Sequence, residues 1–346
     1  MQNPLASDLD HVLDHTRELW DELCGQRLFI TGGTGFFGCW LLESFIWANE
    51  KLNLNAQATV LTRSPDTFRI KAPHLADNEA VTLISGDVRT FDFPDGTFSH
   101  IVHAATESSA KLNDENPLLM LDTIIEGTRH TLDFARTCGA KKFLLTSSGA
   151  VYGKQPPEIT HIPEDYSGAP DPMDPKSAYG QGKRIAEYLC SLYGHQSNIE
   201  MKIARCFAFV GPYLPLDVHF AIGNFIRDGL SGGPIIVKGD GTPRRSYLYA
   251  ADLAIWLWTI LFKGQSCRPY NVGSDEDLSI AEVAQRVARQ FPYKMNMEIH
   301  GMSNPMKPIE QYVPQIDHAR SDLGLDRWIP LDSAIENTID FSKGNR

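Results

Sequence analysis

The sequence predicts an α/β protein in which strands and helices alternate to build a doubly wound parallel sheet, followed by a smaller C-terminal lobe. Three observations predict this fold. Apolar runs of strand length alternate with segments of helical periodicity over residues 26–205. The first apolar run leads directly into a glycine-rich turn. After residue 205 the alternation gives way to short strands, turns and helices in mixed order.

The elements are predicted in chain order. Apolar residues at helical spacing predict a helix over residues 5–23, before the first strand. Strands are predicted over residues 27–31, 58–63, 81–85, 100–105, 142–147 and 201–206, and helices over residues 36–49, 118–138 and 177–194. Residues 154–176 are rich in proline and acids, which is typical of a loop. The apolar run 253–262 is too short to span a bilayer and predicts a buried helix.

Composition excludes several classes of partner. The chain has 346 residues, of which 42% are hydrophobic and 22% charged, as expected of a globular protein with an apolar core. A net charge of −11 argues against nucleic acid as the main partner. The six cysteines form no CxxC or Cys/His cluster, which argues against zinc and favours reduced thiols. Asp8, Asp10 and Asp14 are unsuited to a secretory signal. We therefore expect a cytoplasmic protein with no metal, no membrane segment and no nucleic-acid partner.

A glycine-rich turn joins the first strand to the first helix of the sheet. It reads Thr31-Gly32-Gly33-Thr34-Gly35-Phe36-Phe37-Gly38. Glycines in this position let the backbone approach a pyrophosphate, and the helix N-terminus favours its negative charge. The turn predicts a dinucleotide site on a Rossmann-like sheet, with contacts from Gly32, Thr34, Gly35, Phe36, Phe37 and Gly38.

The ends of the following strands indicate which dinucleotide binds. Enzymes that use NAD usually carry an acid at the end of the second strand, where it holds the ribose hydroxyls. This chain has Arg63 and Ser64 there, and an arginine suits the 2′-phosphate of NADP. We therefore expect NADP(H), with NAD as the alternative. Asp87 follows the third strand and is placed to accept from the adenine amino group, while Ala104 and Ala105 allow a close approach to the cofactor.

Tyr179 and Lys183 form the candidate catalytic pair. Their spacing of four residues places a phenol and an ammonium on one face of a helix. A free tyrosine has a pKa of about 10, and a nearby cation lowers it. A lowering of about 3 units corresponds to roughly 4 kcal/mol of differential interaction. We therefore expect Lys183 to lower the pKa of Tyr179, so that this tyrosine exchanges a proton in a redox reaction.

Five motifs, taken together and in order, resemble one known family. They are the turn of residues 31–38, Asp87-Val88-Arg89, His103-Ala104-Ala105, Ser147-Ser148-Gly149-Ala150-Val151-Tyr152-Gly153, and Tyr179-x-x-x-Lys183. Over residues 26–340 the chain resembles the extended short-chain dehydrogenases. More narrowly, it resembles the NAD-dependent epimerase/dehydratase group that acts on nucleotide sugars.

This resemblance implies roles for individual residues. Ser148 would hydrogen bond the reacting sugar oxygen, Tyr179 would transfer the proton, and Lys183 would bind the nicotinamide ribose. Arg245 would contact the nucleotide diphosphate, and Asn224 would also bind the substrate. The resemblance implies further cofactor contacts from Val88, Thr106 and Ser147. It also implies a homodimer, with the helices at 118–138 and 177–194 of two copies packed as a four-helix bundle.

The chain departs from the family pattern at the position of a catalytic acid pair. Related 4,6-dehydratases carry two acids directly after the catalytic Ser/Thr, and related decarboxylases keep one there. Here these positions are Gly149 and Ala150, and neither side chain can move a proton. Dehydration and decarboxylation are therefore disfavoured, unless an acid from the Glu164-Asp165 loop reaches the site. Ile124 also stands where the family commonly has asparagine.

Together these features divide the chain into three parts. Residues 1–25 form an N-terminal helix. Residues 26–205 form the Rossmann domain that binds the dinucleotide, including the helix with Tyr179 and Lys183. Residues 206–346 form mainly the substrate lobe, with some segments returning to the Rossmann domain. We expect the active site in the cleft between the two lobes.

Three functions remain open from the sequence. The leading hypothesis is NADP(H)-dependent oxidoreduction at carbon 4 of a nucleotide-activated hexose, as the reduction of a 4-keto-6-deoxy nucleotide sugar. The alternative is a nucleotide-sugar 4-epimerase with tightly bound NAD(P). A non-catalytic NADP(H) sensor on the same fold is the third, because fold alone does not establish function. The intact set of Ser148, Tyr179 and Lys183 argues against the sensor.

Overall fold

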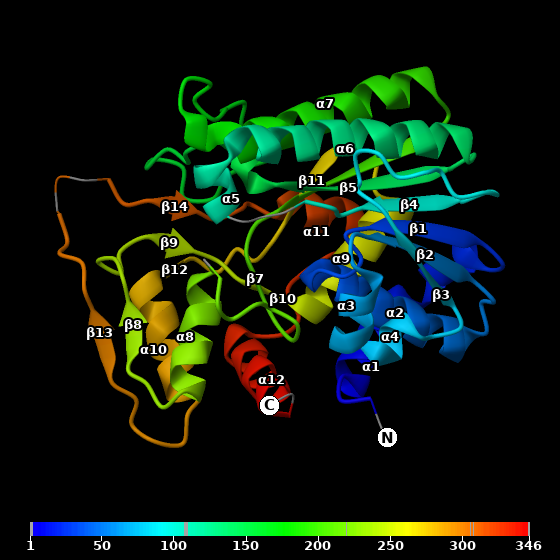
Figure 1. Cartoon of the computed structure of the whole chain (residues 1–346). Coiled ribbons are helices and arrows are strands. Elements are labelled where there is room, and N and C mark those ends of the chain that lie inside the picture. The colour runs from blue at the N-terminus through cyan, green and yellow to red at the C-terminus, as the bar shows by residue number, and fades with distance from the viewer. Residues whose placement is uncertain (1–2, 107–109, 219, 305, 307, 345–346) are drawn as a thin grey trace.

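A seven-stranded parallel sheet runs through the molecule in the computed structural model (Figure 1). The structure describes residues 3–106, 110–218, 220–304, 306 and 308–344. The strand order of this sheet is β11-β6-β5-β4-β1-β2-β3. The strands are β1 (Arg27–Thr31), β2 (Gln57–Thr62), β3 (Val81–Ser85), β4 (His100–His103), β5 (Lys142–Ser148), β6 (Glu200–Cys206) and β11 (Pro269–Val272). All six pairings are parallel, so the carboxyl ends of the strands share one edge, where ligands bind in such sheets.

Helices cover both faces of this sheet. In Figure 1, α6 (Pro117–Thr137) and α7 (Ala178–Gln196) lie above it. Below it lie α1 (Ala6–Thr16), α2 (Phe36–Leu52) and α9 (Ala250–Lys263). The predicted Rossmann-like, doubly wound fold is therefore confirmed. Residues 250–262 of α9 are all buried, and within the described ranges no helix is long and apolar enough to cross a membrane.

The smaller lobe occupies the lower left of Figure 1. Its helices are α8 (Ala221–Leu230), α10 (Ile280–Arg289) and α12 (Leu331–Gly344). Its strands are β8 (Ile235–Val237), which pairs with β13 (Met297–Ile299), and β9 (Arg244–Arg245), which lies between β12 (Leu278–Ser279) and β14 (Gln311–Tyr312). A parallel pair formed by β7 (Phe209–Val210) and β10 (Leu248–Tyr249) leads into α9. Both α9 and β11 follow residue 206 in the chain. Nevertheless, β11 is a strand of the central sheet, and α9 is one of the helices that cover it.

The remaining elements are short. They are α3 (Pro65–Lys71), α4 (Pro73–Ala76), α5 (Ala110–Glu115) and α11 (Asp317–Leu323), with 3-10 turns at Gly149–Tyr152 and Pro175–Ser177. The segment between these two turns is the predicted loop, and it crosses the end of the sheet to form a bridge between Ile162 and Pro314.

The N-terminal segment differs from the single helix expected over residues 5–23. Helix α1 ends at Thr16, and a 3-10 helix continues over Arg17–Leu23. The Thr16 hydroxyl donates to the Val12 carbonyl (2.6 Å) and accepts from the Trp20 indole (2.9 Å), and such back-bonding bends helices. The bend seats Trp20 against Trp258 of α9, with ring centroids 4.7 Å apart.

Candidate active site

The glycine-rich turn and the end of β4 are in direct contact. Gly32 has a φ of +72°, and a Cβ built there would lie 2.5 Å from the Ala104 backbone. A Cβ on Gly38 would lie 2.2 Å from Gly33. Only glycine fits at these two positions, so the loop can hold its main chain close to β4 and to the start of α2. The predicted strand over residues 100–105 ends at His103 because Ala104 and Ala105 pass over this loop.

The N-terminus of α2 is open to an anionic ligand. Gly35 is its N-cap residue and supplies no side-chain cap, and the first turn carries no acid. The first N–H groups of a helix have no intrahelical partner and favour negative charge. The cradle formed by the glycines and these donors fits a dinucleotide pyrophosphate.

The adenosine end of the expected cofactor site carries two arginines beside one acid. Asp87 accepts from the Nε (2.9 Å) and a terminal nitrogen (2.8 Å) of Arg89. This hydrogen bonding lowers the pKa of Asp87 to about 2, with a smaller contribution from Arg63. Arg63 and Ser64 follow β2 and are exposed. The predicted residues therefore lie together at one corner of the sheet, around an ionised carboxylate.

The candidate catalytic pair lies on α7, as predicted, and faces the ends of β4 and β5. The Lys183 ammonium donates to the Thr106 hydroxyl and to the Thr146 carbonyl, both at 2.7 Å. It lies 5.9 Å from the ring centroid of Tyr179. Thr106 thus joins the site through Lys183.

The electrostatics of the pair correct the expectation that Lys183 lowers the pKa of Tyr179. Burial raises the pKa of Tyr179 to about 12, and a hydrogen bond with Ser148, rather than Lys183, opposes this rise. Burial lowers the pKa of Lys183 to about 8. The physical reason is that Lys183 is buried and Tyr179 half-buried, while the ammonium is bound to Thr106 and Thr146 and not to the phenol. Tyr179 is therefore a protonated phenol at neutral pH.

Ser148 ends β5 and lies between two phenols. Its Oγ accepts from the Ala150 N–H (3.1 Å), and it lies 3.4 Å from the hydroxyl of Tyr312. Its second phenolic partner is Tyr179. Tyr312 belongs to β14 of the smaller lobe, so the serine is where the two lobes meet.

The space beside Gly149 is filled. A Cβ on this glycine would lie 2.7 Å from the Phe207 ring and 2.8 Å from the Tyr312 hydroxyl. An acid at position 149 would therefore require both aromatic side chains to move. The Glu164-Asp165 loop does not replace this acid. Glu164 is buried and accepts from the Asn271 N–H (2.9 Å), and Asp165 is exposed.

The expected substrate residues lie in the smaller lobe. Arg245 donates to the Arg244 carbonyl (2.8 Å), and its guanidinium carbon lies 5.9 Å from the Tyr312 ring centroid. Within the described part of the chain Arg245 forms no ion pair, which leaves its charge to a ligand. Asn224 on α8 accepts from Arg227 (3.0 Å) and contacts none of the three catalytic candidates. The structure thus connects Arg245, but not Asn224, to the candidate residue Ser148 through Tyr312.

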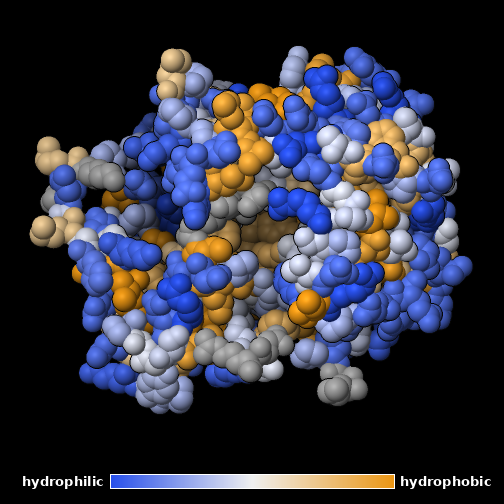
Figure 2. All heavy atoms as spheres, viewed as in Figure 1, coloured by the Kyte–Doolittle hydropathy of each residue, from blue (hydrophilic) through white to orange (hydrophobic). Residues whose placement is uncertain are grey.

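A hollow opens on this face of the molecule. Figure 2 shows it at the centre of the view, between the α6/α7 layer and the smaller lobe, with an apolar floor. No group of three or more His, Cys, Asp or Glu in the described residues is arranged to hold a metal ion.

Two motif residues have structural explanations. His103 is buried between the hydroxyls of Thr31 (2.8 Å) and Thr128 (3.1 Å), and burial lowers its pKa to about 3. It is therefore a neutral link between β1, β4 and α6. Ile124, which stands where the family commonly has asparagine, lies 2.9 Å from the position of a Cβ on Gly182. It fills the contact between α6 and α7.

Sequence reasoning assigned no role to Tyr312 and Glu187. Tyr312 comes 164 residues after Ser148 and reaches it only because β14 pairs with β9. No local pattern indicates that contact. Glu187 follows Lys183 by four residues on α7, so helical spacing was a usable signal.

The fold, the glycine cradle and the Tyr/Lys helix are those of an enzyme of the extended short-chain dehydrogenase type. A family model described as the NAD dependent epimerase/dehydratase family matches residues 28–273. The chain belongs to that family.

Its curated relatives include decarboxylases. UDP-glucuronic acid decarboxylase 6 of Arabidopsis thaliana is 32% identical over 306 residues, which cover 88% of this chain and 85% of the relative. UDP-glucuronic acid decarboxylase 1 of Xenopus tropicalis is 30% identical over 316 residues, which cover 91% and 72%.

Solved structures share the fold at lower identity. The UDP-glucuronic acid 4-epimerase of Bacillus cereus, in complex with UDP-glucuronic acid and NAD, matches with a TM-score of 0.77 and 21% identity, over 92% of this chain and 100% of that chain. The dTDP-glucose 4,6-dehydratase of Streptomyces venezuelae, with NAD bound, matches with a TM-score of 0.77 and 20% identity, over 92% and 98%.

Proposed function

We propose that the protein catalyses oxidoreduction at carbon 4 of a nucleoside-diphosphate sugar, as a 4-epimerase that retains NAD. The observation that carries the proposal is the contact of Ser148 with Tyr179 and Tyr312 beside a glycine with no room for an acid. Such a site would hold and exchange the proton of one sugar hydroxyl, but neither Gly149 nor Ala150 offers a side chain to eliminate water or assist loss of CO2. Structural matches named as 4-epimerases and 4,6-dehydratases support chemistry at carbon 4.

Each candidate residue has a part in this reaction. The dinucleotide, held by the Gly32–Gly38 loop, would supply the hydride chemistry. Tyr179 would take the proton of the carbon-4 hydroxyl in its phenolate form, so its own proton must first leave, and it would return the sugar's proton after the sugar has turned. Ser148 donates to the carbonyl oxygen in between, and Lys183 holds the nicotinamide ribose. Arg245 binds the diphosphate, because its guanidinium has no carboxylate partner among the described residues.

The epimerase proposal is tested with a nucleotide sugar that carries deuterium at carbon 4. We expect the C4 epimer to keep the deuterium, because the same hydride leaves and returns, and we expect no added cofactor to be consumed. The Tyr179→Phe variant should bind NAD but lose activity by a factor of roughly 10²–10⁴. Loss of the deuterium to solvent, or full activity in Tyr179→Phe, would contradict the proposal.

A second candidate is the NADPH-dependent reduction of a 4-keto-6-deoxy nucleotide sugar. Two observations favour it. The raised pKa of Tyr179 keeps the phenol protonated, ready to give a proton to a ketone. The end of β2 carries Arg63 in place of an acid. Stoichiometric loss of NADPH absorbance with such a ketone would establish the reductase. If an Arg63→Ala variant kept the wild-type preference between NADPH and NADH, Arg63 would no longer support NADPH as the cofactor.

We also propose that the protein is a homodimer in which the second copy binds the outer face of α6 and α7. Leu118 on α6 is 72% exposed, and on α7 Ile185, Tyr188 and Leu192 are 38%, 64% and 37% exposed. These three lie on one side of α7 because they are three and four residues apart. An apolar strip of this kind on two adjacent helices supports a homodimer in which the helices of two copies form a bundle.

A further inference from the structure

Glu187 is an acid on the catalytic helix that the proposed reaction leaves unused. It follows Tyr179 by eight residues and Lys183 by four, so all three project from the same side of α7. Its carboxylate accepts from the Ser147 hydroxyl at 2.6 Å. Ser147 directly precedes Ser148 on β5. Glu187 therefore joins the helix of the Tyr/Lys pair to the strand of the catalytic serine.

Arg205 of β6 fixes this carboxylate. Its Nε and one terminal nitrogen donate to Glu187 at 3.0 and 2.7 Å, and the two side chains are only 12% and 14% exposed. The other terminal nitrogen donates to the Tyr152 hydroxyl (2.8 Å) and to the Glu164 carbonyl (3.0 Å). The arginine thus has partners on both sides, and Glu187 is held in one orientation.

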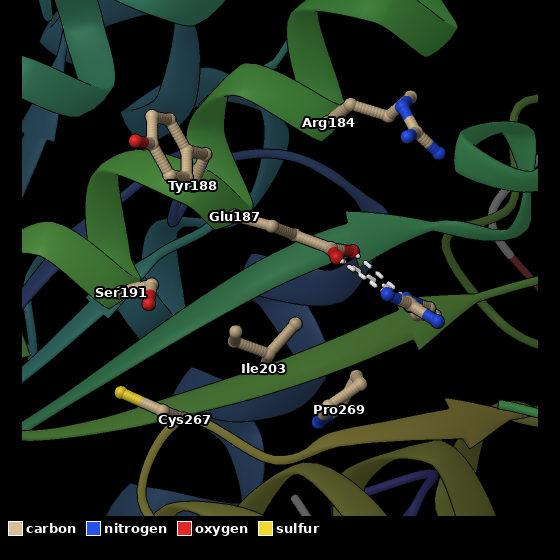
Figure 3. Close-up of a pocket in the computed structure, with 8 residues that line it drawn as sticks. Arg184, Glu187, Tyr188, Ser191, Ile203, Cys267 and Pro269 are labelled. Atoms are coloured by element: carbon tan, nitrogen blue, oxygen red, sulfur yellow. Dashed lines mark hydrogen bonds and ion pairs between the residues drawn. The ribbon is translucent and has the colours of Figure 1, made fainter. Parts of the chain in front are cut away.

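A pocket of about 290 Å³ opens on this pair from the outer edge of the sheet. Figure 3 shows Glu187 extending from α7, with dashed lines marking its bonds, while Tyr188 and Ser191 of the same helix line the rim. The pair therefore lies between the catalytic helix and solvent, on the side away from the cofactor loop.

Most of the groups around Lys183 are uncharged. Thr106 and the Thr146 carbonyl accept from it, and Tyr179, His103, Cys190, Cys206 and Glu187 face it. Burial raises the pKa of both thiols, that of Cys206 to about 12, so they are neutral at working pH. His103 is also neutral. Among the described groups that act on Lys183, Glu187 is then the one anion.

We propose that Glu187 is a positioning residue which, clamped by Arg205, keeps Lys183 in its ammonium form and holds the end of β5 through Ser147. The inference rests on the roles given to Lys183 and Tyr179 in the proposed function. Without Glu187, Lys183 would lose its anion, and Arg205 would become an unpaired cation in the same region. Both changes favour a neutral lysine.

The test is the pH profile of the Glu187→Gln variant. The amide oxygen can still accept from Ser147, and the side chain keeps its shape, but the charge and one acceptor for Arg205 are removed. We expect the alkaline limb of kcat/KM to move to lower pH by roughly one unit. The pH at which NADH binding weakens, followed by NADH fluorescence, should move in the same direction. Glu187→Asp, which keeps the charge, should leave both limbs near their wild-type position.

A matched control removes a carboxylate from another partly buried ion pair. Glu276 pairs with Arg286 and Arg327 in the smaller lobe. Glu276→Gln should lower stability without moving either pH limb. If Glu187→Gln lost activity equally at every pH, with both pH profiles otherwise unshifted, the proposal would be overturned. Glu187 would then be a purely structural link.

Folding of the variant does not limit the test. Should Glu187→Gln fail to fold, the Glu187→Gln/Arg205→Gln variant leaves no unpaired charge and takes its place. Its limbs should then lie below those of wild type, and unchanged limbs would overturn the proposal. A wild-type protein that turns over no nucleotide sugar would refute the proposed function instead. The NADH-binding limb would still decide the role of Glu187.

Discussion

Single residues decide which chemistry this site can perform, and Gly149 is the clearest case. A methyl group there would displace the Phe207 ring or the Tyr312 hydroxyl, which lie 2.7 and 2.8 Å from its Cβ position. We expect Gly149→Ala to lower kcat/KM on every substrate by roughly 10- to 100-fold, because small displacements of reacting groups are costly. The control is Gly344→Ala, whose Cβ would meet nothing within 4 Å. Equal activity of Gly149→Ala and wild type would show that the space is not filled.

Lys183 gives the protein a defined dependence of stability on pH. Its pKa is lowered to about 8 in the folded protein, from 10.5 for an ordinary lysine. Between these values the unfolded chain binds more protons, so stability rises with pH. The free energy of unfolding of wild type, relative to Lys183→Met, should rise by roughly 2–3 kcal/mol between about pH 8 and pH 10. Urea titrations across this range measure the difference. A flat difference would mean that Lys183 titrates as an exposed lysine.

The error on Tyr179 shows where reasoning from residue type fails. The spacing of Tyr179 and Lys183 predicted the shared helix face but not the depth of the site. Tyr179 is half-buried, and Tyr312 of the smaller lobe is one of the groups near it, which no local pattern predicts. This burial reverses the sign expected from the neighbouring cation.

At the scale of elements, the start of α2 makes the cofactor site. The turn could be predicted from sequence because every glycine that the contact needs lies within seven residues, next to the strand that positions it. Six of the seven strands of the sheet were predicted, because most of their apolar runs are buried, whereas β11 was not predicted. Helix α1 was predicted too long because the bend at Thr16 depends on Trp20 meeting Trp258 of α9.

The close contact in this turn gives a direct test of cofactor binding. A Cβ at position 38 would lie 2.2 Å from the Gly33 backbone. We expect Gly38→Ala to abolish binding of NADH, measured by its fluorescence, and to destabilise the fold by roughly 1–3 kcal/mol. Gly239→Ala, with nothing within 4 Å of its Cβ position, should bind NADH normally. Normal binding by Gly38→Ala would exclude the loop as the pyrophosphate site.

The contact between the two lobes could not be predicted from the sequence. The role of Tyr312 depends on the register of β14 beside β9. The same register brings Arg245 over the Tyr312 ring. Two short strands with little periodicity thus determine how the smaller lobe faces Ser148.

For the whole molecule, the outer face of α6 and α7 is the surface on which the homodimer proposal depends. Tyr188 lies on that face and is 64% exposed. We expect Tyr188→Glu to convert a dimer to a monomer in light scattering after gel filtration, because a charge in an apolar interface is unpaired and desolvated. Tyr293→Glu, on the smaller lobe, should remain a dimer. A wild-type monomer at high concentration would contradict the homodimer.

The relatives at 30–32% identity are named decarboxylases, whereas the filled space at Gly149 points to chemistry confined to carbon 4. Overall sequence identity therefore favours decarboxylation, whereas the residues beside Ser148 favour a reaction at carbon 4. The relatives establish the family, while the reaction depends on groups within a few ångströms of Ser148. For this reason the proposal follows the site.

The most direct measurement is the product spectrum by proton NMR after the purified protein is incubated with UDP- and dTDP-linked hexoses and uronic acids. We predict that every converted sugar differs from its substrate only at carbon 4, with carbon 6 and its oxygens intact. Release of CO2 from UDP-glucuronic acid, loss of water to a 4-keto-6-deoxy sugar, or no conversion of any substrate would contradict the central claim.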